Sequence, residues 1–125
     1  MDKLLDTIIS AIEDKKGKNI LCIDLKEVEG SITDAFVVCN AESTTQVAAI
    51  ADGIEEKVLE TLGEKPRRIE GMQNAIWVVV DYMDVMVHIF QTQAREFYRL
   101  DELWADAPST KYGEWENEIK RQTTR

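Results

Sequence analysis

The sequence contains few of the residues that build metal sites, redox centres and disulfide frameworks. It has two cysteines and a single histidine in 125 residues, and neither a Cys-x-x-Cys motif nor a His-rich tract occurs. Cys22 and Cys39 each lie inside an apolar run, where a reduced thiol packs as a small hydrophobic side chain. We therefore expect two buried free thiols, no metal ion and no cofactor.

The sequence also lacks the long apolar segment of a membrane protein. No apolar run approaches the roughly 18–20 residues that cross a bilayer. The first residues are charged and amphipathic, unlike a secretory signal. We expect a cytoplasmic protein with no membrane partner.

A chain of this length, with 44% hydrophobic residues, can bury one core but not two. We expect a single domain over residues 1–107. The segment 108–125 is rich in Lys, Glu and Thr, and it is predicted to be a loosely attached helix or disordered, with Tyr112 and Trp115 as its only anchors.

The formal net charge is −9, from 24 acidic and 15 basic residues. A field of this sign repels phosphate backbones and attracts basic surfaces, so direct specific binding of nucleic acid is disfavoured. The alternative, that the acidity only keeps the protein in solution, stays open from charge alone.

Apolar periodicity predicts an α/β fold. Helical spacing is found over 4–12 and 47–62, and the second helix begins with a capping box, Ser43 to Gln46, and ends at Gly63. Continuous apolar runs predict strands over 20–25 and 36–39, a short edge strand is expected at 69–71, and a short helix at 92–98. Leu100, Leu103 and Trp104 are expected to join the core.

The stretch 75–90 predicts a β-hairpin, because two apolar runs flank the segment 81–84. With Tyr82 and Met83 as the loop, antiparallel counting places Trp77 opposite His88 and Asp81 opposite Asp84. One face is then purely aliphatic and predicted to be core: Ile76, Val78, Val80, Val85, Val87 and Ile89. The other face is mixed: Trp77, Val79, Met86, His88 and Phe90.

The mixed face has two interpretations that the sequence does not separate. A helix could cover it, since sheets in α/β proteins often pack on both faces. Alternatively, it could bind a partner, because Trp and Met bring large contact area and His brings a polar group.

No catalytic constellation stands out. Gly30-Ser31 lacks the glycines and lysine of a phosphate loop, and His88 has no partner evident in the sequence. Metal-dependent nucleotidyl transfer needs converging carboxylates, typically two residues apart on one strand face, whereas Asp81 and Asp84 flank a turn. Their simpler role is to cap the turn or to meet a cationic partner, and we predict that the protein is not an enzyme.

A set of motifs follows in a recognisable order along the chain. They are Thr33-Asp34-Ala35-Phe36-Val37-Val38, Ser43 to Gln46, Glu70-Gly71, Trp77-Val78-Val79-Val80-Asp81-Tyr82, Asp84-Val85-Met86-Val87-His88-Ile89-Phe90, Arg95-Glu96-Phe97-Tyr98 and Leu103-Trp104. Together they resemble the ribosomal silencing factor family, also called Iojap-like proteins, over roughly Leu4 to Ala107.

The resemblance implies a mixed β-sheet flanked by helices, with a topology like that of nucleotidyltransferases but without their catalytic residues. It implies binding to the large-subunit ribosomal protein numbered fourteen, steric blocking of subunit joining, and repression of translation when nutrients are scarce. Related organellar proteins assist large-subunit assembly. The alternatives are a nucleotide-binding or nucleotidyltransferase-like enzyme, which is the rival from another functional class, and a large-subunit assembly factor. A homodimer away from the ribosome is also left open.

The partner-binding candidates come from the resemblance together with the hairpin pattern. They are Trp77, Asp81, Tyr82, His88, Phe90, Arg95 and Tyr98. Three positions depart from the family, and the one that matters is Met83, where the family usually has glycine; the variation at Ala35 and Asn40 is expected to be tolerated. Since glycine best supplies the positive φ of a tight hairpin turn, the turn here is expected to be wider or strained.

Overall fold

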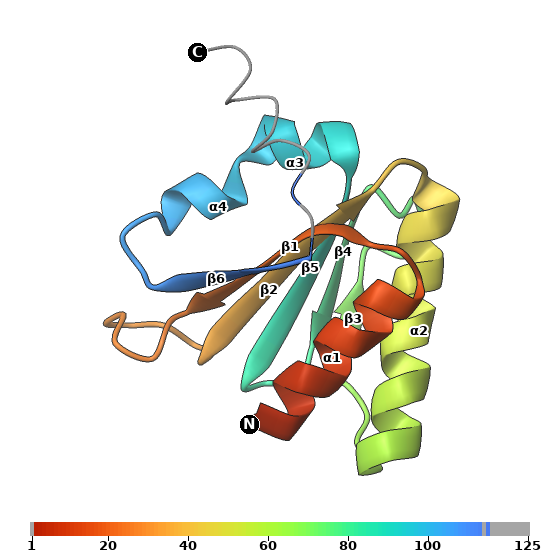
Figure 1. Cartoon of the computed structure of the whole chain (residues 1–125), viewed down its shortest axis with the longest axis horizontal. Coiled ribbons are helices and arrows are strands. Elements are labelled where there is room, and N and C mark those ends of the chain that lie inside the picture. The colour runs from red at the N-terminus through yellow and green to blue at the C-terminus, as the bar shows by residue number, and fades with distance from the viewer. Residues whose placement is uncertain (1, 114, 116–125) are drawn as a thin grey trace.

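The structure is a computed structural model that describes residues 2–113 and 115. Within these residues, six strands form one sheet with helices on both faces (Figure 1). The elements in chain order are α1 (Asp2–Asp14), β1 (Lys18–Asp24), β2 (Ala35–Ala41), α2 (Thr44–Leu62), β3 (Arg68–Glu70), β4 (Trp77–Asp81), β5 (Val85–Gln91), α3 (Thr92–Tyr98), α4 (Leu100–Leu103) and β6 (Ser109–Tyr112).

The sheet is mixed, with the strand order β3-β4-β5-β2-β1-β6. The central strands β2 and β5 are parallel, and each of the other neighbouring pairs is antiparallel. The predicted fold class, a mixed sheet flanked by helices, is confirmed. The expected edge strand near residue 69 is also confirmed, because β3 lies at one end of the sheet.

The two faces of the sheet bury different side chains. Helices α1 and α2 cover one face (Figure 1), where the aliphatic residues of the central strands join their apolar stripes in the larger core. The shorter helices α3 and α4 lie over the other face, where a smaller and more aromatic core includes Phe90, Leu100 and the partly buried Trp77. The aromatic face of the hairpin is thus largely covered by helices.

Helix α2 begins and ends where the sequence indicates. Ser43 caps α2 by accepting the Gln46 N–H at 3.1 Å, and Gly63 ends it in the left-handed conformation at φ 67°. The predicted capping box is only half formed, because the Gln46 side chain does not reach back to Ser43. It donates instead to the carbonyls of Lys15 and Lys16, which ties the end of α1 to the start of α2.

The hairpin forms as predicted, but its register differs from the prediction. Trp77 pairs with Phe90, two residues beyond the expected His88, and Asp81 pairs with Met86. The physical reason is the turn: Met83 has φ 78°, and the Asp84 N–H donates to the Tyr82 carbonyl at 3.0 Å, as in a γ-turn. The turn is therefore tight and strained at Met83, not wider.

A register shift of two residues leaves the two faces unchanged, because side chains alternate along a strand. The aliphatic face is buried as predicted except at Ile76, which is 43% exposed. That residue lies just before β4 begins, at the end of the sheet.

The expectation of a helix or disorder from residue 108 is wrong for Ser109–Tyr112. These residues form β6, which pairs with β1 from Ile20↔Tyr112 to Ile23↔Ser109. Beyond them, the Trp115 indole donates to the Ile20 carbonyl at 3.3 Å. Residues 114 and 116–125 lie outside the described residues.

Both cysteines are buried free thiols, and burial raises the pKa of Cys39 to about 12. Within residues 2–113 and 115, none of the helices combines the length and apolar character that a bilayer crossing requires.

Candidate functional site

Most of the predicted partner-binding residues lie in the interior. Five of the seven are buried: Asp81, Tyr82, His88, Phe90 and Arg95. Trp77 is partly buried and Tyr98 is exposed. In this structure, only the last two can touch a partner directly.

Trp77 is the centre of an aromatic cluster on the face that α3 covers. Its ring stacks on Phe90 with centroids 4.8 Å apart, and it contacts Tyr98 at 4.9 Å. Its Nε1 donates a hydrogen bond to Nδ1 of His88 at 3.1 Å. The prediction that Trp77 and His88 share a face is confirmed, although they are not directly opposite each other.

Above this cluster, the two short helices expose apolar side chains to solvent. Phe97 is 78% exposed, Leu103 is 73% exposed, and the Tyr98 ring meets Phe97 edge-on at 5.1 Å. The prediction that Leu103 belongs to the core is therefore wrong, whereas Leu100 is buried. We call the exposed Phe97, Tyr98 and Leu103 the α3–α4 surface.

The exposed charged side chains on α3 and α4, and just after them, are mostly acidic. They are Glu96, Glu102 and Asp106, with one cation, Arg99, which lies 3.9 Å from the Glu102 carboxylate. Large apolar side chains beside a net acidic charge suit a partner that is itself basic at its edge. Sequence reasoning missed Phe97, because a seven-residue helix is too short for apolar periodicity to identify its exposed side.

Arg95 holds α3 against the sheet. Its Nη1 donates to the Asn19 carbonyl and to Oδ1 of Asn40, the latter at 2.9 Å, and its Nη2 lies 2.8 Å from a carboxylate oxygen of Asp101. The guanidinium also lies over the Trp115 ring, 5.1 Å from its centroid. These contacts make Arg95 an internal clamp that fixes the position of the α3–α4 surface.

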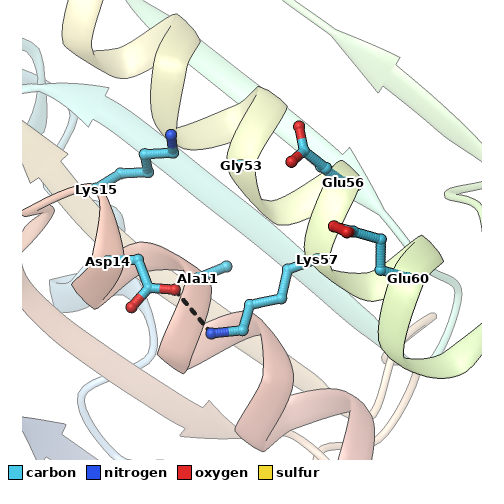
Figure 2. A pocket seen from close by; sticks show the side chains of 7 residues that line it. All are labelled: Ala11, Asp14, Lys15, Gly53, Glu56, Lys57 and Glu60. Carbon is cyan, nitrogen blue, oxygen red and sulfur yellow. Dashed lines mark hydrogen bonds and ion pairs between the residues drawn. The ribbon is translucent and has the colours of Figure 1, made fainter.

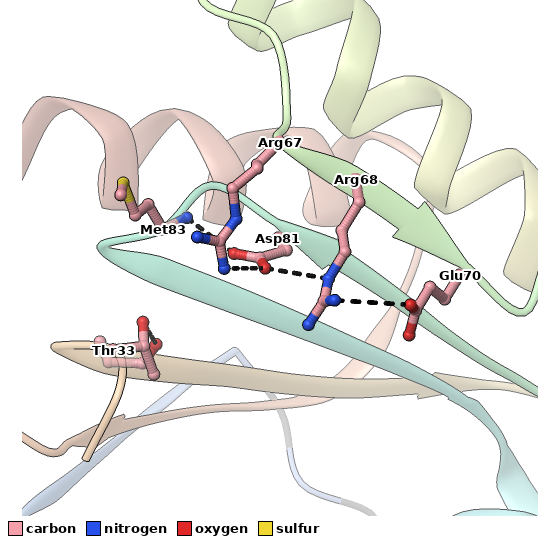
Figure 3. A network of polar contacts seen from close by, with 7 residues as sticks. Thr33, Arg67, Arg68, Glu70, Asp81 and Met83 are labelled. Carbon is pink, nitrogen blue, oxygen red and sulfur yellow. Dashed lines mark hydrogen bonds and ion pairs between the residues drawn. The ribbon is translucent and has the colours of Figure 1, made fainter. Parts of the chain in front are cut away.

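Asp81 forms ion pairs with two arginines at the start of β3 (Figure 3). Its carboxylate accepts from Arg67 at 2.9 Å and from the Met83 N–H at 2.8 Å, and Arg68 lies 3.3 Å away. Burial favours the neutral acid, but the Arg67 and Met83 hydrogen bonds outweigh it and lower the pKa of Asp81. Capping of the turn, one of the two predicted roles, is confirmed for Asp81, while the expected pairing with the exposed Asp84 is wrong.

Two other buried groups carry polar atoms that find no partner in the described residues, the Tyr82 hydroxyl and Nε2 of His88. Burial raises the pKa of Tyr82 above its usual value and lowers the pKa of His88 to about 4. Both side chains are therefore neutral near neutral pH.

A pocket of about 300 Å³ lies between α1 and α2 (Figure 2). Lys57 at this pocket is already engaged, since its Nζ lies 2.7 Å from both Asp14 and Ser10. Across residues 2–113 and 115, no cluster of three or more His, Cys, Asp or Glu side chains could hold a metal ion.

Comparison with known proteins gives one consistent result. The family model described as "ribosomal silencing factor during starvation" matches residues 1–125. A curated ribosomal silencing factor from Halalkalibacterium halodurans is 37% identical over 109 residues, which cover 87% of this chain and 92% of that protein. A crystal structure of a Chromobacterium violaceum protein superposes with a TM-score of 0.80 at 28% identity, covering 93% of this chain and 92% of that one.

A more distant relative is the mouse protein named "mitochondrial assembly of ribosomal large subunit protein 1", 26% identical over 102 residues. The match covers 80% of this chain and 44% of the mouse protein. With a family model that spans the whole sequence and a relative at 37% identity over most of both chains, the protein belongs to the ribosomal silencing factor family.

Proposed function

We propose that this protein binds the large ribosomal subunit through the ribosomal protein numbered fourteen and sterically blocks joining of the small subunit. Translation is thereby repressed when nutrients are scarce. Family membership over residues 1–125 carries this proposal. The name of the mouse relative also refers to the large subunit.

The α3–α4 surface is the part of the molecule best suited to that contact. Exposed aromatic side chains provide large contact area, and such residues often dominate the binding free energy of protein interfaces. The net charge of −9 and the excess of acidic side chains exposed on α3 and α4 favour approach to a basic ribosomal protein, while the field repels encounters with bare RNA.

We also propose that the protein acts without catalysis. The candidate catalytic pair of the rival enzyme is Asp81 and Asp84. Asp81 is buried and ion-paired with Arg67 and Arg68, while Asp84 is exposed in the turn. The two carboxylates therefore lie in different environments, and the engagement of Asp81 by arginines supports a structural role for it.

Co-sedimentation with purified subunits tests the proposal. The protein should pellet with large subunits and not with small ones, and adding it before the subunits are mixed should lower the yield of joined ribosomes without nucleoside triphosphate. Equal binding to both subunits, or blocking that depends on a triphosphate, would overturn it. Titration with nucleoside triphosphate and Mg²⁺ would reveal the rival as saturable binding.

A matched pair of variants tests the surface itself. Phe97 and Ile32 are both 78% exposed, but Ile32 lies in the loop before β2, outside the α3–α4 surface. Phe97→Ser should weaken binding to the large subunit by about tenfold or more, as expected for an interface anchor. Ile32→Ser should leave affinity unchanged, and equal effects from the two variants would refute this assignment.

A further inference from the structure

The aromatic cluster around Trp77, beneath the α3–α4 surface, also contains a hydrogen bond between two side chains. Packing of the apolar rings does not by itself require this bond. The Trp77 indole N–H donates to His88 Nδ1 across the hairpin, between strands in which His88 pairs with Val79. An indole N–H can only donate, so Nδ1 must be the acceptor. The neutral imidazole therefore carries its proton on Nε2.

This arrangement carries a cost in stability. Nε2 is buried with no acceptor within the described residues, and the nearby Phe36 ring meets the imidazole at 72°, with centroids 4.6 Å apart. A buried donor without an acceptor is destabilising. An apolar side chain of similar size would fill the space without that cost, so the particular contribution of His88 is its Nδ1 acceptor.

The hydrogen bond fixes the Trp77 ring, which Tyr98 of α3 contacts. The Trp77 ring contacts both Phe90 and Tyr98, whose own centroids are 6.3 Å apart, and Tyr98 in turn touches Phe97. A flip of the indole would turn its N–H away from Nδ1 and leave a second buried polar group unpaired. The contact with His88 therefore selects one orientation of the indole.

We propose that His88 is a positioning residue of the docking surface: by accepting from Trp77, it holds the indole in the orientation that supports Tyr98 and the α3–α4 surface. This inference rests on the proposed function, since it assigns a purpose to the ring orientation in subunit binding. A surface that is already ordered loses less conformational freedom on docking, and binding is tighter for that reason.

The hydrogen bond can be measured in the unaltered protein. Nitrogen-15 NMR should detect a coupling between Nε1 of Trp77 and Nδ1 of His88 across the N–H···N contact. The Trp77 indole signal is identified by its loss in Trp77→Phe, and the imidazole needs no assignment because His88 is the one histidine. Lack of the coupling, together with rapid exchange of this indole proton with water, would overturn the proposal.

Variants then test the consequence for docking. His88→Leu removes the acceptor, whereas His88→Asn offers a carbonyl oxygen near the position of Nδ1. His88→Leu should speed indole exchange and weaken binding to large subunits about three- to tenfold, the range for loss of one hydrogen bond, and His88→Asn should restore part of both. Thermal unfolding shows whether each variant is folded, and the NMR coupling stands independently if His88→Leu is not.

A double-variant cycle separates positioning from general stability. If His88 acts through the indole, adding His88→Leu to Trp77→Phe should cause no further loss of affinity. A further loss of the same size, or normal affinity of His88→Leu despite faster indole exchange, would overturn the proposal. If the unaltered protein fails to bind large subunits, the proposed function falls, and the NMR coupling still reports whether His88 holds the ring.

Discussion

Acidification should destabilise this protein through His88, at pH values above those at which the Asp81 carboxylate contributes. The imidazole is 5% exposed and surrounded by the uncharged rings of Phe36, Trp77 and Phe90. Burial lowers its pKa to about 4. Because the histidine of an unfolded chain titrates near about 6.5, the unfolded state binds a proton that the native state excludes throughout the interval between these values.

The sign and size follow from proton linkage. A lowered histidine pKa means that stability rises with pH across this interval, so the free energy of unfolding falls as pH falls. With pKa values of about 4 folded and about 6.5 unfolded, the loss between about pH 7.5 and about pH 5 is about 2 kcal/mol. The lowered pKa of Asp81 acts in a separate and more acidic window, because its stabilisation is lost only as that carboxylate becomes protonated.

Urea unfolding over a pH series, in the parent and in His88→Leu, measures the effect. Over this pH range, the free energy of unfolding of the parent should fall by about 2 kcal/mol more than that of His88→Leu. An NMR titration of the single imidazole gives the folded pKa directly. A measured pKa of about 6.5 would refute the reasoning that burial keeps the imidazole neutral. The same pH dependence of unfolding free energy in both proteins would refute it too.

Three further predictions follow from other parts of the structure. Met83→Gly should raise the free energy of unfolding by about 1 kcal/mol, since glycine adopts the φ of 78° without strain; a lower urea midpoint would contradict this. Trp77→Ala should lower it by about 3 kcal/mol, because the ring packs against Phe90 and Tyr98; an unchanged melting temperature would show that the indole is not structural. Raising salt should slow association with large subunits far more than it speeds release, given the net charge of −9, and stopped-flow rates independent of salt would argue against electrostatic steering.

The sequence was informative where burial repeats with a regular period. The apolar stripes of α1 and α2 and the two faces of the hairpin could be predicted, because a helix and a strand each impose one period on their side chains. The register could not, since it depends on one backbone angle at Met83 that a non-glycine residue rarely adopts. Strand β6 could not be predicted, because its residues are mostly exposed and do not alternate between apolar and polar.

The candidate site was predicted in composition and not in exposure. Arg95 is expected on a surface by its type, yet its acceptors belong to Asn19 and Asn40, which are 76 and 55 residues away in the chain. No local pattern can reveal such partners. Leu103 shows the converse error, because its apolar character indicates burial while its position on a short helix leaves it in solvent.

The pairing of β1 with β6 sets an order for folding during synthesis. β1 leaves the ribosome early, and its neighbours in the sheet are β2, which follows soon after, and β6, which is the last strand within residues 2–113. Until Ser109–Tyr112 emerge, one edge of β1 exposes unpaired backbone groups next to the apolar residues 20–23, the kind of edge that joins other chains. During synthesis this edge of β1 is open to pairing with other chains, and β6 closes it once residues 109–112 have emerged.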